Sequence, residues 1–160
     1  MKKIITIAAF MLLAFSAMAQ DGKSLYKKYS DAEGVSGVYI SPAMFRLMGK
    51  IPDMEFDGND VNLGRLIKSL SGFYLISSTN AGINAALYND ADRFISKGQY
   101  EMLMESKDNG ETVRMYTMGD EETVTGFVMV ASEGDECTFI CIDGQMKREE
   151  LEKLLSESIN

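Results

Sequence analysis

The C-terminal half of the chain alternates apolar and polar residues, and this period of two predicts β-strands. Four such segments lie at residues 100–106, 112–118, 124–131 and 136–142. The turn signals between them are Asp108-Asn109-Gly110, Gly119-Asp120 and Gly134-Asp135. Because links this short join neighbouring strands, the four strands are predicted to form an antiparallel meander.

The N-terminal half mixes the two periods. Residues 35–40 are rich in β-branched and aromatic residues and 73–76 are a short apolar run, so both predict strands. After the first, Ser41 suits a helix N-cap and Pro42 the first helical position, which predicts a helix to Met48 that Gly49 stops. A loop over 50–60 and a second helix over 61–70, broken by Ser71-Gly72, are expected before the second strand.

Two longer helices complete the pattern. The first is capped within 78–80, runs to Lys97 and ends at Gly98, and the last covers 145–158 after Asp143-Gly144 ends the final strand. The first has its apolar stripe at Ile83, Ala86, Leu87, Ala91, Phe94 and Ile95. Helices with a single stripe need a sheet to cover, so we predict an α+β two-layer sandwich, with helices on one face of a mainly antiparallel sheet. In the first strand, Val38 and Ile40 are expected to face the core and Tyr39 the opposite side.

The first 19 residues have the pattern of a secretory signal peptide. Lys2 and Lys3 precede an apolar stretch over 4–15, and Ala17-Met18-Ala19 presents small residues where a signal peptidase cleaves. We therefore expect cleavage between Ala19 and Gln20, export to the periplasm, and no stable membrane anchor afterwards. The expected organisation is a signal peptide over 1–19, a polar segment with a short helical patch over 20–34, and a single domain over 35–160.

Composition removes several classes of function. The 160 residues carry a formal charge of −8, and loss of Lys2 and Lys3 would make it −10, so nucleic acid and anionic lipid are poor partners. The chain has no His, which excludes the usual Ser-His-Asp and Cys-His arrangements and the commonest zinc ligand. Nine Met would remain after cleavage, and those at 102, 104, 115 and 129 are expected to fill the core.

Cys137 and Cys141 are the two cysteines. Four residues of a strand span about 13 Å, too far for a disulfide even in an exported protein. Both side chains share a face with Phe139, so two buried free thiols are expected.

Three candidate sites fail on closer reading. Asp53-x-Glu55-x-Asp57-Gly58 resembles the start of a calcium loop, but the twelfth position is Gly64 where a bidentate Glu is needed. Ser24-Leu25-Tyr26-Lys27 has the S-x-x-K spacing without the companion motifs, and we expect it to lie outside the core. The acids at 120–122 and at 133, 135 and 136 fall at turns and predict solvated loops. We therefore assign no catalytic, cofactor-binding or metal-binding residue.

Three segments carry a family resemblance: residues 35–45, residues 109–116, and residues 133–136 leading into Gly144. Together they resemble the domain of unknown function 4252 family (DUF4252), over about residues 23–158. The family is typical of exported proteins in Bacteroidetes, and the resemblance implies fold and location but no reaction or cofactor.

Two functions remain open. The first is a non-enzymatic periplasmic domain that binds an unknown protein or small ligand in the cell envelope, with an exposed sheet edge as one possible docking place. The alternative is a hydrolase that uses carboxylates alone on envelope glycans. A carboxylate pair about 5–10 Å apart in an apolar cleft favours the enzyme, and acids at loop tips favour binding.

Overall fold

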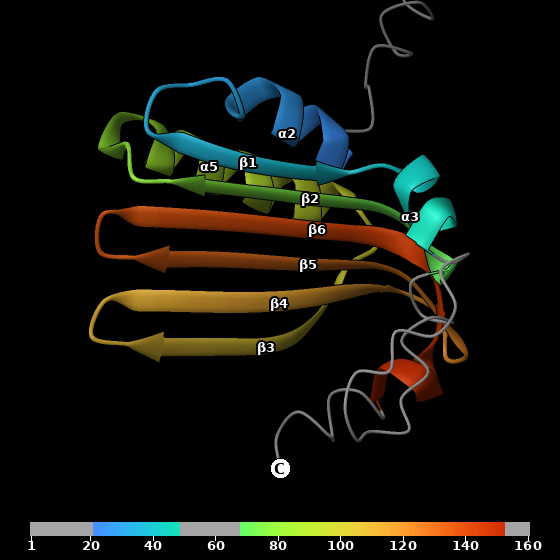
Figure 1. The fold of residues 1–160 in the computed structure, drawn as a ribbon. Coiled ribbons are helices and arrows are strands. Elements are labelled where there is room, and N and C mark those ends of the chain that lie inside the picture. The colour runs from blue at the N-terminus through green and yellow to red at the C-terminus, as the bar shows by residue number, and fades with distance from the viewer. Residues whose placement is uncertain (1–20, 49–67, 153–160) are drawn as a thin grey trace, which may run out of the picture.

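A computed structural model describes residues 21–48 and 68–152, which form a sheet with helices packed against it (Figure 1). The strands are β1 Val35–Ile40, β2 Leu70–Ser78, β3 Glu101–Asp108, β4 Glu111–Gly119, β5 Thr123–Glu133 and β6 Glu136–Lys147. They form one six-stranded sheet in the order β1-β2-β6-β5-β4-β3. Every neighbouring pair is antiparallel, and β3 to β6 follow one another as the predicted meander. The predicted α+β class is confirmed.

Two helices cover one face of the sheet. These are α2 Gly22–Tyr29 and α5 Ala81–Lys97; in Figure 1, α5 runs behind the strands and α2 lies next to β1 at the top of the view. Asp21 caps α2 by accepting a hydrogen bond from the Ser24 amide at 2.7 Å, and Asn80 caps α5 by accepting one from the Gly82 amide at 3.0 Å. The short helix α3 Pro42–Met48 follows β1 at the end of the sheet.

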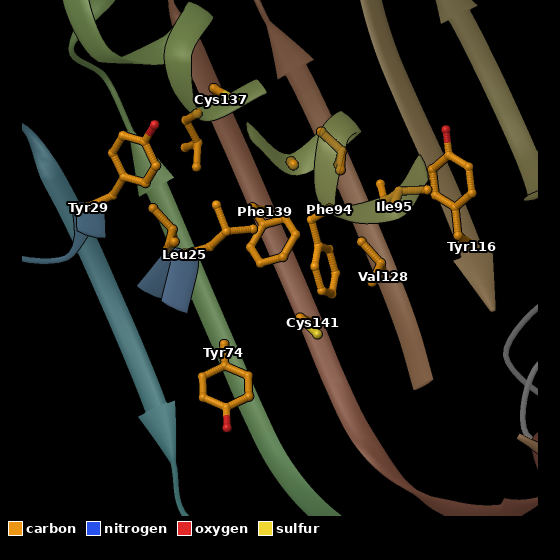
Figure 2. Packing of buried hydrophobic residues seen from close by; sticks show 14 residues of the cluster. Leu25, Tyr29, Tyr74, Phe94, Ile95, Tyr116, Val128, Cys137, Phe139 and Cys141 are labelled. Atoms are coloured by element: carbon orange, nitrogen blue, oxygen red, sulfur yellow. The ribbon is translucent and has the colours of Figure 1, made fainter. Parts of the chain in front are cut away.

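The core lies between these two helices and the middle strands (Figure 2). The ring of Phe94 from α5 meets that of Phe139 from β6 edge to face, with centroids 6.0 Å apart. Leu25 of α2 is also buried in this cluster, so the expectation that residues 24–27 lie outside the core is wrong. Cys137 and Cys141 are buried, free, and on the same side of β6 as Phe139, as predicted.

β2 and β6 extend furthest beyond their predicted bounds, because pairing partners outweigh local glycine signals. Ser71-Gly72 do not break a helix before β2, since Leu70 already pairs with Gly144 and Gly72 with Asp143. In the same way β6 continues beyond Asp143-Gly144 to Lys147, and the helical residues begin only at 148. Of the predicted helix over 61–70, residues 68 and 69 are helical and residues 61–67 lie outside the described residues. Residues 153–158 of the predicted last helix also lie outside them.

The residues of β1 alternate between the two faces of the sheet as predicted, but each lies on the face opposite to the one expected. Val38 is 46% exposed on the opposite face, and Tyr39, which is 38% exposed, lies on the side of the helices. The Tyr39 ring stacks on Tyr74 of β2 with centroids 5.2 Å apart and lies 5.8 Å from Tyr26 of α2. Since α2 supplies an aromatic neighbour on this face, Tyr39 contacts the helix side of the sheet although it stays partly exposed.

Candidate functional site

The face of the sheet opposite α2 and α5 carries a continuous row of apolar side chains. The strand register places six paired residues in it, from one edge of the sheet to the other: Val38, Leu75, Ile140, Met129, Met115 and Met104. Val38 and Met104, at the two ends, are 46% and 44% exposed, and the four between them are half-buried. We call this face, which the described helices leave uncovered, the open face (Figure 1).

A second row runs beside the first on the open face. Its members are Ile40, Phe73, Ile142, Phe127 and Thr117, followed by Glu101 at the β3 corner. Thr117 is buried, and the four apolar residues before it are half-buried. On the other side of the first row, the register aligns smaller residues: Ser36, Ser77, Thr138, Ala131, Val113 and Ser106. Glu101 is therefore the one charged residue among these three rows of the described sheet, in a protein whose residues are 25% charged.

The methionines of the open face correct a prediction from the sequence. Met104, Met115 and Met129 were expected to fill the core, yet they lie side by side on three adjacent strands, on the face that the described helices leave uncovered. Met102 is also exposed, at 49%, and pairs with Tyr116 across β3 and β4. The sequence does not separate the two faces, because apolar residues occupy both.

The described thiols are poor nucleophiles. Burial raises the pKa of Cys137 to about 11 and, with the nearby Asp143 carboxyl, raises that of Cys141 further. Since the thiolate is the reactive form, both cysteines serve packing. Burial also raises the pKa of Asp143 itself, which lies within weak hydrogen-bonding distance of the Cys141 Sγ at 3.8 Å.

The buried carboxyl of Asp90 ties α5 to α2. Its Oδ2 accepts a hydrogen bond from the Tyr29 hydroxyl at 2.7 Å and one from the Lys28 ammonium, while Arg93 lies 3.5 Å from Oδ1. Burial alone would raise the pKa of Asp90, but the bonds from Lys28 and Tyr29 outweigh it, so the pKa is lowered. A carboxylate held in this way joins two helices.

The candidate motifs from the sequence fall into structural positions or outside the described residues. The Ser24 hydroxyl donates to the Asp21 cap at 2.7 Å, so it belongs to the start of α2. Asp120 accepts from the Glu122 and Thr123 amides at 2.9 and 2.6 Å and thereby shapes the β4–β5 turn. The acidic segment 53–60 lies outside the described residues, and within the described part no group of three or more metal-ligating side chains gathers.

The comparison with protein families shows which family the chain belongs to. Residues 26–154 match the family model described as Domain of unknown function (DUF4252). The chain belongs to this family. Neither the comparison with curated proteins nor that with solved structures gives a match.

The match gives the DUF4252 domain its extent in this chain. It begins within α2 and passes the end of β6, so it includes the open face and the helices behind the sheet. None of the helices described here is long and apolar enough to cross a membrane.

Sequence reasoning missed the open face of the DUF4252 domain, although a signal for it is present. Phe73-Tyr74-Leu75-Ile76 in β2 and Phe139-Ile140-Cys141-Ile142 in β6 are continuous apolar runs. Such runs are typical of strands that are covered on both faces, whereas a half-exposed strand alternates. These two adjacent strands thus indicated a second covering layer.

Proposed function

We propose that this protein is an exported, non-enzymatic binding domain that receives an amphipathic helix of a partner protein on its open face. The observation that carries the proposal is the apolar row that crosses all six strands. Large contiguous apolar patches on a protein surface mark interaction sites.

The shape of the patch suits one helix. Five inter-strand spacings of about 4.8 Å make the row about 24 Å long, which is the length of about 16 helical residues. Neighbouring residues on one face of a strand are about 6.6 Å apart, so two rows with their side chains cover about 12 Å, the diameter of a helix. We call these two rows the apolar band. A small ligand would leave most of the apolar band in contact with water.

The chemistry of the patch favours the apolar stripe of such a helix. Three of the six residues in the first row are Met, whose unbranched thioethers adapt to different partner side chains. Glu101 is the one charged residue of the apolar band, while the whole chain carries a formal charge of −8. A partner with an apolar stripe and basic flanks would therefore match both the band and its surroundings.

The placement of the acids supports binding rather than glycan hydrolysis. Asp120, Glu121 and Glu122 are exposed at the β4–β5 turn, and Glu133, Asp135 and Glu136 are exposed at the β5–β6 turn. Asp90, the one buried acid among the described residues, is held by Lys28 and Tyr29, so its role is structural.

Export rests on the pattern of residues 1–19. The protein recovered from the periplasm should begin at Gln20, and Ala19→Arg should block cleavage because a large charge enters the small-residue position. Intact mass of the exported protein measures this. Retention of residues 1–19 in that protein would remove the export part of the proposal.

Helix binding can be measured with a defined probe. The probe is a leucine–lysine peptide of about 16 residues with one apolar stripe, and a peptide of the same composition in scrambled order is its control. With the purified protein, the striped peptide should shift the methyl signals of Met104, Met115 and Met129 in NMR spectra, and the scrambled peptide should not. We expect a Kd on the order of 10 μM.

Matched variants test the location of the site. Met104→Glu and Val38→Glu, at the two ends of the row, should weaken binding about tenfold or more, since each places a charge in the apolar interface. Met102→Glu is the control, because Met102 has similar exposure on the same strand but pairs outside the row. Equal effects of the substitutions at 102 and 104, or a protein dimer that Met104→Glu dissociates, would contradict the proposal.

A further inference from the structure

Three methionines of the open face are direct neighbours in the strand register. Met104 of β3 pairs with Met115 of β4, and Met115 pairs with Met129 of β5. Side chains of directly paired residues lie on the same face of a sheet, with their Cβ atoms about 4.5–5.5 Å apart. We call these three side chains the methionine triplet. Met102 also lies on β3 but pairs with Tyr116, a residue of the core cluster, so it belongs to the helix side.

The sulfurs of the methionine triplet can meet around one point. Met115 lies in the middle, and the Cβ atom of each outer methionine is about 5 Å from its own. Each sulfur is two bonds beyond its Cβ on an unbranched chain, so the outer side chains can lean along the row toward Met115. Met104 is 44% exposed and the other two are half-buried, so an ion can reach the sulfurs from solvent.

The neighbours of the methionine triplet on the open face are mostly apolar. Val113 and Thr117 flank Met115 on β4, and Phe127 and Ala131 flank the neighbouring methionine on β5. An apolar shell around a metal site limits the access of water to the ion. Such a shell suits an ion that is held by neutral sulfur and does not need a hydration shell.

The ligand type defines the class of ion. Thioether sulfur is a soft ligand and selects Cu(I), whereas Ca²⁺ and Mg²⁺ require several oxygens and Zn²⁺ is held by Cys, His or carboxylates. The described residues bring no group of three or more His, Cys, Asp or Glu together, and thioethers are not among those ligands. Glu101, on the same strand as Met104, adds one negative charge near the methionine triplet, which favours a cation.

We infer that the methionine triplet binds a soft monovalent cation of the Cu(I) class through its three thioether sulfurs. The inference goes beyond the proposed function, because a partner helix requires only an apolar surface and the ion requires sulfur. Leucine in place of methionine separates the two, since it keeps the volume and the apolar character of the side chain and removes the ligand.

The experiment is a titration of the purified protein with silver nitrate, followed by the methionine methyl signals in NMR spectra. Ag(I) is the probe because it shares the ligand preference of Cu(I) and keeps its oxidation state during the titration. The signals of Met104, Met115 and Met129 should shift together with a Kd on the order of 10 μM. Those of Met102 and Met146 should stay in place, and zinc nitrate should shift none of the five.

Two leucine substitutions form a matched pair. Met115→Leu removes the central sulfur and should weaken Ag(I) binding more than about tenfold, while the striped leucine–lysine peptide still binds. Met102→Leu should leave Ag(I) binding unchanged, and the buried thiols of Cys137 and Cys141 are the same in both variants.

Three results would overturn the inference: no shift of the methionine triplet up to about 1 mM Ag(I), an equal shift of Met102, or unchanged affinity in Met115→Leu. A wild-type protein that binds Ag(I) at the methionine triplet but does not bind the striped peptide would contradict the proposed function alone.

Discussion

At the residue scale, the buried carboxyl of Asp90 and the half-buried carboxyl of Asp143 are held in opposite ways. Asp90 is stabilised as an anion by Lys28 and Tyr29, which lowers its pKa below the ordinary value of 3.8. Asp143 is mainly desolvated, which raises its pKa above the same value. The two should therefore contribute to stability with opposite signs at neutral pH.

Substitution of each carboxyl by its amide separates these contributions. Asp90→Asn should lower the free energy of unfolding by about 1–2 kcal/mol at neutral pH, because it removes a charge-assisted hydrogen bond. This loss should shrink as the pH falls below 3.8 toward the lowered pKa of Asp90, since the wild-type carboxyl then takes up a proton too.

Asp143→Asn should instead raise the free energy of unfolding at neutral pH. The folded state keeps the proton on Asp143 longer than the unfolded state, so wild-type stability falls as the pH rises from 3.8 through the raised pKa. Urea unfolding of both variants across this pH range measures the effect. Destabilisation by both substitutions at every pH would show that the environment of Asp143 has been misjudged.

At the element scale, β1 shows what alternation can and cannot predict. The period of two separates Val38 from Tyr39 correctly, but the facing direction depends on α2, which packs only in the folded chain. Tyr39→Ser should cost about 2 kcal/mol, because it removes the ring contacts with Tyr26 and Tyr74. Val38→Asp, on the open face, should cost about 1 kcal/mol or less. Thermal unfolding of the two variants compares them, and the reverse order would restore the orientation expected from the sequence.

The turn from β4 to β5 depends on a glycine. Gly119 has a φ of +147°, and a Cβ there would overlap the carbonyl oxygen of Thr123, whose position is fixed by the Asp120 amide at 2.8 Å. Gly119→Ala should therefore cost more than about 2 kcal/mol. Gly134 in the next turn has a φ of +54° and open space around it, so Gly134→Ala should cost about 1 kcal/mol. Similar losses in chemical unfolding would argue against a steric constraint at Gly119.

At the scale of the whole molecule, local signals predicted most of the framework. Strand periodicity and turn residues gave the meander, and Asn80 and Gly98 marked the ends of α5. The full lengths of β2 and β6 were not predicted, because Leu70 and Gly144 pair only when the two strands meet across 74 residues of chain. Such pairing depends on the tertiary structure and overrides a local Gly signal.

The sequence could indicate the open face only in part. It leaves a trace in the apolar runs of β2 and β6, which a reading based on alternation alone passes over.

The central claim is that the open face is uncovered in the isolated protein and is covered by a partner helix. Methionine methyl NMR with a soluble paramagnetic agent tests both halves, because Met146 is only 4% exposed and serves as an internal buried reference. In the free monomer, the agent should broaden Met104, Met115 and Met129 strongly and Met146 little, and the striped peptide should then protect the first three. Protection of Met115 and Met129 equal to that of Met146 before any peptide is added would contradict the account, because the chain itself would then cover the face.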